Sequence, residues 1–241
     1  MTTYKDHGFY THQPYVMEVL KTITGNILEC GCGDGSTYMI KKHIHDQCTS
    51  DQCTSDQQCT TDRCTSDQQC TTNRQLVSLE SNLEWLNKYT HLADANHQLY
   101  HVATDNTDCL ETGNKWVDFI QTLEIKDFEM VFLDSSPWMS RKCCFDYFLN
   151  ISKIIIIHDF DYFPNNNIIG TTISKTNVDG KEKIVCDLTG IVKNYRLFYP
   201  PYKYFIGLTG PPTLICSNIM EKDEFDALMN VIETNEASYY E

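Results

Sequence analysis

The chain has 241 residues and a formal net charge of −14, because 33 acidic residues outnumber 19 basic ones. This length suits one domain with a sizeable core, spanning residues 1–241, and is too short for two full domains. The acidity makes a nucleic-acid partner unlikely, since such a partner requires a basic surface and no Lys/Arg run is longer than a pair. We expect a small partner instead, neutral or cationic.

The sequence contains no predicted export or membrane segment. Residues 1–20 are polar and lack the apolar core of a secretory signal. The longest apolar runs, such as the four isoleucines at 154–157, are far too short to span a membrane. Several of the 12 cysteines lie in apolar, strand-like runs, where a thiol behaves as a small hydrophobic group. We therefore expect a soluble, intracellular (cytoplasmic) protein without a membrane partner.

Outside residues 46–73, strand-like and helix-like segments alternate along the chain. Short apolar runs predict strands, and the amphipathic stretches between them predict helices. The predicted strands are residues 26–30, 75–80, 98–103, 128–134 and 153–159, and the predicted helices are 36–44, 82–89, 114–123 and 141–150. This alternation is typical of βαβ units, so we predict an α/β fold with a mostly parallel central sheet and helices on both faces.

The pattern changes after residue 160. Residues 195–219 contain two strand-like runs joined by Pro/Gly turns, which predict an antiparallel C-terminal strand pair that closes the sheet. A final helix is predicted over residues 221–233.

Residues 46–73 form an internal repeat in which five cysteines lie five or six residues apart. Apart from cysteine, the repeat has no apolar side chain with which to bury a face. The composition therefore favours a low-complexity, disordered insertion. Zinc binding is less favoured, because zinc ligands are usually paired two to four residues apart. A short β-solenoid is the other alternative.

A glycine-rich turn follows the first predicted strand, in the segment NILECGCGDGST (26–37). Such a turn places backbone N–H groups and a helix N-terminus beside a ligand, which suits NAD, FAD, a nucleoside triphosphate or S-adenosylmethionine. A P-loop is excluded because no Gly-Lys-Ser/Thr follows, and the third glycine is one residue early for the dinucleotide fingerprint. The carboxylate of Glu29 would repel a pyrophosphate but would suit the cationic amino-acid end of S-adenosylmethionine.

In these residues the chain resembles the class I S-adenosylmethionine-dependent methyltransferases. LECGCGDGST is similar to the family motif acidic-x-Gly-x-Gly-x-Gly. The segments VSLESNLEWL, FLDSSPWMSRK, IIIIHD and PPTLICSN are similar, in the same order, to a poorly characterised bacterial-type branch, so the resemblance covers nearly the whole chain outside the insertion. Two positions depart from that branch, which has His where Ser135 stands and Arg where Ser140 stands.

The resemblance implies a Rossmann-like methyltransferase fold and S-adenosyl-L-methionine as the cofactor. In this family, the acidic residue at the end of strand two accepts hydrogen bonds from the ribose hydroxyls, and an acidic residue after strand three contacts the adenine. The implied cofactor-binding residues are Glu29, Gly31, Gly33, Gly35, Ser36, Thr37, Glu80 and Asp105.

Structural alternatives accompany these assignments. The glycines alone would permit a tight strand-to-helix turn, and Glu80 would serve equally well as a cap for the following helix. Trp85 and Tyr89 lie at helical spacing, so we expect them to pack rather than to stack on adenine.

Two predicted strands end in residues that are suited to catalysis: Asp134 after the fourth, and His158 and Asp159 after the fifth, with Asp161 close by. Ligands of open α/β sheets lie beyond these carboxyl ends. Methyl transfer to a hydroxyl requires that its proton be removed, either by a histidine or carboxylate base or with the help of a divalent ion.

Asp134 and Asp159 resemble the acidic residues with which some O-methyltransferases of this fold hold Mg²⁺. We give Mg²⁺-assisted chemistry and metal-free base catalysis equal weight.

Flanking residues extend this predicted site. Arg141 and Lys142 open a predicted helix, where they either pair with an anionic substrate or remain at the surface. Tyr10, His12 and Gln13 precede the first strand and are expected to fold over the cofactor.

The predicted function is O-methylation of a small molecule or a sugar. The alternatives are a protein or RNA methyltransferase and a catalytically inactive, methyltransferase-like binding module.

Overall fold

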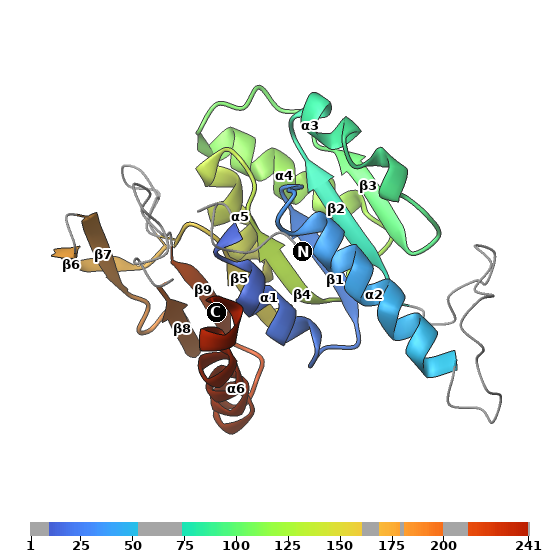
Figure 1. Cartoon of the computed structure of the whole chain (residues 1–241). Coiled ribbons are helices and arrows are strands. Elements are labelled where there is room, and N and C mark those ends of the chain that lie inside the picture. The colour runs from blue at the N-terminus through green and yellow to red at the C-terminus, as the bar shows by residue number, and fades with distance from the viewer. Residues whose placement is uncertain (1–9, 53–73, 161–168, 179–180, 200–211, 241) are drawn as a thin grey trace.

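A seven-stranded sheet forms the centre of the computed structural model (Figure 1). The structure describes residues 10–52, 74–160, 169–178, 181–199 and 212–240. The strand order is β3-β2-β1-β4-β5-β9-β8. The strands are β1 (Asn26–Cys30), β2 (Leu76–Glu80), β3 (His97–His101), β4 (Phe128–Leu133), β5 (Ile154–Ile157), β8 (Asn194–Phe198) and β9 (Thr213–Ser217).

The five strands from β1 to β5 pair in parallel, whereas β9 is antiparallel to both of its neighbours, β5 and β8. The predicted α/β fold with a mostly parallel sheet and an antiparallel C-terminal strand pair is therefore confirmed at this level. Every residue of β2, β5 and β9 is buried, as expected of strands that are covered on both faces.

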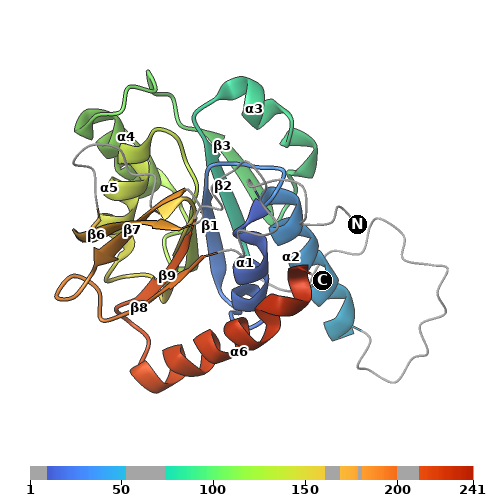
Figure 2. The same ribbon diagram turned by 60° about the vertical axis from the view of Figure 1, so that its left-hand side comes forward.

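Helices cover both faces of the sheet (Figure 2). One apolar core joins the sheet to α1 (Gln13–Leu20), α2 (Thr37–Gln52) and α6 (Lys222–Tyr240). A second core, on the opposite face, joins it to α4 (Leu110–Thr122) and α5 (Trp138–Phe148). The short helix α3 (Leu83–Asn87) and a 3₁₀ turn, η3 (Thr90–Leu92), follow β2. None of the described helices is long and apolar enough to cross a lipid bilayer.

The structure contains elements that the sequence analysis did not predict. Helix α1 begins at Gln13 with a proline in its first turn, and it buries Tyr15, Val16, Val19 and Leu20 against the sheet. Strands β6 (Thr171–Val178) and β7 (Lys181–Asp187) form a separate antiparallel pair. Helix α2 continues to Gln52, so residues 46–52 of the repeat are helical, while residues 53–73 lie outside the described part of the chain.

Candidate functional site

A cavity of about 400 Å³ lies at the carboxyl ends of β1, β4 and β5. In the sheet, β2 and β3 lie on one side of β1, and β4 and β5 lie on the other. The strand order therefore reverses between β1 and β4, where the cavity lies. This is the usual ligand position in open α/β sheets. The lining comes from residues 32–36 of the glycine-rich turn, from the charged residues that follow β4 and β5, and from Tyr10, His12 and Trp85.

The three glycines of the turn have different structural roles. Gly31 has a φ of +98°, and a Cβ there would lie 2.5 Å from the backbone oxygen of Asp134. A Cβ on Gly35 would lie 2.6 Å from Cδ1 of Tyr10. A Cβ on Gly33 would have no contact closer than 3.6 Å among the described residues, and Gly33 lines the cavity. At Gly31 and Gly35, the missing side chain therefore allows the backbone of Asp134 and the ring of Tyr10 to approach closely. At Gly33, it leaves space for a ligand.

Glu29 lies beneath the glycine turn, and its side chain is fully buried. Its carboxyl group is surrounded by three hydroxyls: Ser36 Oγ at 2.5 Å, Thr37 Oγ1 at 3.0 Å and Ser78 Oγ at 2.6 Å. Burial raises the pKa of Glu29 to about 7, although the three hydrogen bonds oppose the shift. Of the predicted cofactor residues, Ser36 lines the cavity, while Glu29 and Thr37 lie behind it.

Ser78 connects Glu29 to His97, and the hydrogen bonds of His97 bear on the proton of Glu29. His97 Nδ1 lies 3.2 Å from the carbonyl oxygen of Leu92, which only accepts, so Nδ1 carries a hydrogen. Burial lowers the pKa of His97 to about 4, so the ring is neutral and its Nε2 accepts. Nε2 lies 2.9 Å from Ser78 Oγ, so the single hydrogen of Ser78 is available to only one of two acceptors, His97 or Glu29. Below the pKa of Glu29 its own proton bridges to Ser78, which then donates to His97; above that pKa, Ser78 donates to the Glu29 carboxylate.

Glu80 connects the end of β2 to the glycine turn. Its carboxylate accepts hydrogen bonds from the backbone N–H groups of Cys32 (3.0 Å) and Asn82 (2.8 Å). The side chain that caps α3 is that of Asn82, so the capping role considered for Glu80 belongs to its neighbour. Asp105 is exposed and accepts hydrogen bonds from Thr107 and Thr112 at the start of α4. The contacts of Glu80 with ribose and of Asp105 with adenine stay predictions.

The predicted catalytic residues come together at the opposite wall of the cavity. His158 is buried between two carboxylates: its Nδ1 lies 3.1 Å from Asp134 Oδ1, and its Nε2 lies 3.3 Å from Asp159 Oδ1. Burial acts to lower the pKa of His158, but the two carboxylates raise it above the usual value. Burial raises the pKa of Asp159, with opposition from His158. Asp161 lies outside the described residues.

Arg141 completes this group from the first turns of α5. Its guanidinium donates to three backbone oxygens, those of Ser135 (2.7 Å), His158 (2.6 Å) and Asp134 (3.2 Å), and it also pairs with the Asp134 carboxylate at 2.9 Å. Burial opposes ionisation of Asp134, yet His158 and Arg141 lower its pKa below the usual value. Lys142 points elsewhere and pairs with Asp146 on the same helix. Of the two basic residues, only Arg141 reaches the cavity among the described residues.

The segment before α1 closes another side of the cavity. Gln13 donates to the backbone oxygen of Gly35 at 2.5 Å, and Thr11 Oγ1 lies 3.0 Å from His158 Nε2. The His12 ring packs against Phe132 and His158, with centroids 4.9 Å and 4.4 Å away. Both ring nitrogens of His12 are buried and make no hydrogen bond of regular geometry among the described residues. Burial lowers the pKa of His12 to about 3, and the backbone of Gly35 opposes this shift. These residues were expected near the cofactor, and the structure also brings Thr11 and His12 against His158.

Trp85 packs against Tyr89 and Leu86, as expected, and it also lines the cavity. Its ring lines the cavity, and its Nε1 donates to the backbone oxygen of Cys32 at 2.5 Å. Tyr89 is fully buried and donates to Asp34 at 2.7 Å, in agreement with the packing role expected for it. The Nζ atom of Lys88 lies over the Trp85 ring, 3.3 Å from its centroid, while Tyr89 supports the turn.

The predicted Mg²⁺ site does not fit the observed carboxylates well. Mg²⁺ takes oxygen ligands, but the His158 ring lies between the carboxylates of Asp134 and Asp159, and Asp159 is not part of the converging set. The donor atoms that converge among the described residues are instead those of His12, Asp134 and His158, which all lie within 4.8 Å of one another. This is a set rich in nitrogen.

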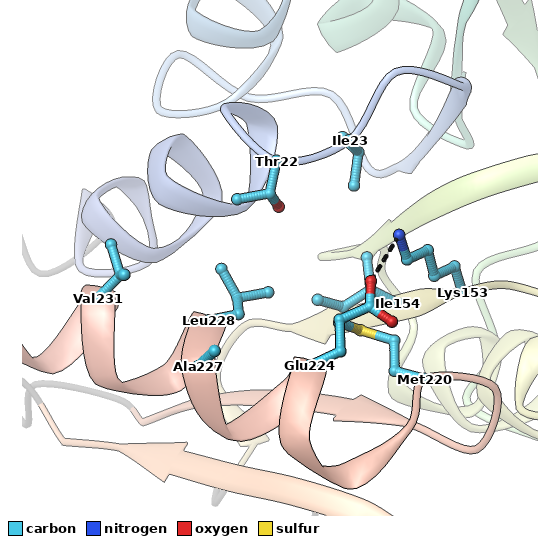
Figure 3. A pocket seen from close by; sticks show the side chains of 9 residues that line it. All are labelled: Thr22, Ile23, Lys153, Ile154, Met220, Glu224, Ala227, Leu228 and Val231. Carbon is cyan, nitrogen blue, oxygen red and sulfur yellow. Dashed lines mark ion pairs between the residues drawn. The ribbon is translucent and has the colours of Figure 1, made fainter.

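A second cavity, of about 260 Å³, lies at the opposite end of β5 (Figure 3). It is formed between α6, the segment after α1 and the first residues of β5. Its lining is mainly aliphatic, with Leu228 and Val231 facing Thr22 and Ile23, and its main polar feature is the ion pair between Lys153 and Glu224. It lacks the converging polar groups of the first cavity, which we take as the candidate functional site.

No protein-family model matches the chain, and a search of curated proteins gives no significant match.

Proposed function

We propose that the protein is a class I S-adenosylmethionine-dependent methyltransferase with a Rossmann-like fold, and that it methylates a hydroxyl of a small molecule or a sugar. The observation that carries the proposal is the cavity at the reversal of strand order, with Gly33 and Ser36 on one wall and Asp134, His158 and Asp159 on the other. Its volume of about 400 Å³ falls within the range of small-molecule sites. The resemblance of the glycine motif to that family supports the choice of cofactor.

S-adenosylmethionine would supply the methyl group as a sulfonium, and the chain would position the acceptor and remove its proton. The residues of the chain divide these tasks. The turn from Gly33 to Ser36 and the ring of Trp85 would hold the cofactor. Asp159 is the best placed proton acceptor, because its side chain is 22% exposed and its raised pKa favours proton uptake. His158, with both nitrogens engaged, would orient Asp159.

The first experiment is a calorimetric titration with S-adenosylmethionine. A Gly33→Leu variant would project its side chain into the cavity from a position with open space, so it should abolish binding while the fold is retained. A Lys142→Met variant, altered on the same side of the molecule but away from the cavity, is the control and should bind normally. Equal binding by the wild-type protein and Gly33→Leu would rule out this cavity, and no binding by the wild-type protein would rule out the cofactor.

Methyl transfer is tested next, with radiolabelled methyl donor and fractionated cell extract. Label in a small-molecule fraction is the expected result, and label in protein or RNA would favour the alternative substrates. The second candidate is a binding module without turnover. It is favoured by the packing of Tyr10 beside Gly35 and by the engagement of both His158 nitrogens, which leaves His158 no free acceptor atom. Cofactor binding without transfer to any fraction would support it.

A further inference from the structure

We propose that His12, Asp134 and His158 form a binding site for a divalent transition metal, with two nitrogen ligands and one oxygen ligand. The three residues come from separate parts of the chain: the segment before α1, the end of β4 and the end of β5. Their donor atoms lie within 4.8 Å of one another, so one point lies within about 2.8 Å of all three, close to metal–ligand distances of about 2.0–2.2 Å. Small side-chain rotations would close the remaining gap.

The separation of two of these ligands already matches a metal site. His158 Nδ1 and Asp134 Oδ1 are 3.1 Å apart. Two ligands at tetrahedral angles around Zn²⁺ lie about 3.3 Å apart, given metal–ligand distances of about 2.0–2.2 Å. A distance of 3.1 Å therefore suits either a shared proton or a shared metal ion.

His12 is the independent observation that points to a ligand. Its side chain is 1% exposed, and neither ring nitrogen makes a hydrogen bond of regular geometry among the described residues. The backbone of Gly35 interacts with the ring, but its carbonyl oxygen already accepts from Gln13 at 2.5 Å. Burying a polar group without a partner is costly, so such groups in proteins usually have one. The ring is held by Phe132 and His158 and belongs to the converging set, so a metal ion would supply the missing partner.

The surrounding residues provide the supporting contacts that metal ligands need. A histidine ligand usually donates its other ring N–H to a carboxylate, and His158 Nε2 lies 3.3 Å from Asp159. Arg141 Nη2 lies 2.9 Å from Asp134 Oδ1, the same oxygen that faces His158 Nδ1, and so holds that oxygen in place. Imidazole nitrogen with a single carboxylate suits Zn²⁺, Fe²⁺, Co²⁺ or Mn²⁺ better than Mg²⁺.

The metal would face the cavity, because all three ligands line it. A further coordination position directed into the cavity could take a hydroxyl and lower its pKa. This consequence rests on the proposed function, whereas metal binding itself does not.

The test is a titration of the metal-free full-length protein with Co²⁺, followed by visible absorption. The expected result is saturation at one equivalent with bands of nitrogen and oxygen ligands. His12→Ala should weaken binding by at least about 100-fold, more than the loss of a merely supporting partner usually does. His91→Ala removes an exposed histidine outside the cluster and should bind as the wild type does. His12→Gln is a second variant that keeps a polar side chain, and circular dichroism checks the fold of each.

The 12 cysteines are the main competing ligands, so X-ray absorption of the wild-type protein with one equivalent of Co²⁺ decides the identity of the ligands without any variant. Imidazole scattering without a sulfur shell is expected. A sulfur shell, an absence of saturable binding, or equal affinity of the folded His12 variants and wild type would overturn the site. S-adenosylmethionine binding is measured on metal-free protein, so failure of the metal site and failure of the proposed function are separate results.

Discussion

The raised pKa of Glu29 leads to a prediction about the free energy of unfolding and its dependence on pH. We consider Glu29→Gln, which is nearly isosteric with the neutral acid. The amide oxygen would accept from Ser36 and Thr37 as the carboxyl oxygen does, and the amide nitrogen would donate to Ser78 in place of the acid proton. The substitution therefore preserves every hydrogen bond of this buried group.

The magnitude follows from the pKa of Glu29, which burial raises from 4.5 to about 7. Between these two pH values the folded protein keeps the proton and the unfolded chain releases it, so the free energy of unfolding falls as the pH rises. The fall is about 1.4 kcal/mol per pH unit and about 3 kcal/mol in total, and it is complete above pH 7. Below pH 4.5 both states are protonated and the group contributes no pH dependence. The amide of the Glu29→Gln variant has no such proton to lose, so the variant lacks this fall.

Urea unfolding followed by circular dichroism, at steps from pH 4 to pH 8, measures this difference. Relative to wild type, Glu29→Gln should gain about 3 kcal/mol across the range, and it should be the more stable protein at pH 8. Glu124→Gln, at an exposed glutamate, is the control and should show no such gain. A difference between Glu29→Gln and wild type that stays constant with pH would show that folding does not raise the pKa of Glu29, and the reasoning from its burial would then be wrong.

Three further predictions concern the walls of the cavity. Gly31→Ala should lower the free energy of unfolding by more than about 3 kcal/mol, because a Cβ there would lie 2.5 Å from the backbone of Asp134. The control, Gly190→Ala, has a similar φ of +83° but no atom within 4 Å of the added Cβ, so it should cost only about 1 kcal/mol. Equal losses would mean that φ alone sets the cost. Arg141→Met should lower the free energy of unfolding, measured with urea, by about 3–5 kcal/mol, because it leaves a buried carboxylate and three backbone oxygens without their partner. Lys142→Met should change the same free energy by less than about 0.5 kcal/mol. A similarly small loss in Arg141→Met would contradict this anchoring role. Glu80→Ala should weaken S-adenosylmethionine binding by about 1–3 kcal/mol in calorimetry, and unchanged affinity would limit Glu80 to its backbone contacts.

The sheet was predictable because its signal is local. Apolar runs bounded by polar residues mark β1, β2, β4 and β5, and once strands are parallel their carboxyl ends share one edge. That is why Asp134, His158 and Asp159 were expected together and lie together. The hairpin of β6 and β7 was not predicted, although the sequence carries between these strands an Asp-Gly dipeptide at 179–180, which is a strong hairpin signal.

The missed parts of the site depend on contacts between distant residues. His12 meets His158 because α1 packs on the sheet beside α6, and no local pattern near residue 12 encodes that meeting. The partners of Glu29 follow from the register of β1 with β2, which pairs Glu29 with Ser78, and of β2 with β3, which brings in His97. Such pairings require the strand order, which the sequence alone did not provide.

The two walls of the cavity manage buried acidic groups in opposite ways. Beneath the glycine turn, burial raises the pKa of Glu29 to about 7, although three hydroxyls hydrogen-bond to its carboxyl group. Across the cavity, Asp134 has Arg141 and His158 beside it and stays charged despite burial. On one wall, a cationic ligand would therefore meet the charge of Asp134, which Arg141 and His158 already balance. On the other wall it would meet Glu29, an acid that can release its proton. Binding of a cation near the turn should favour ionised Glu29, so the same group that lowers stability above neutral pH would become a source of binding energy for the ligand.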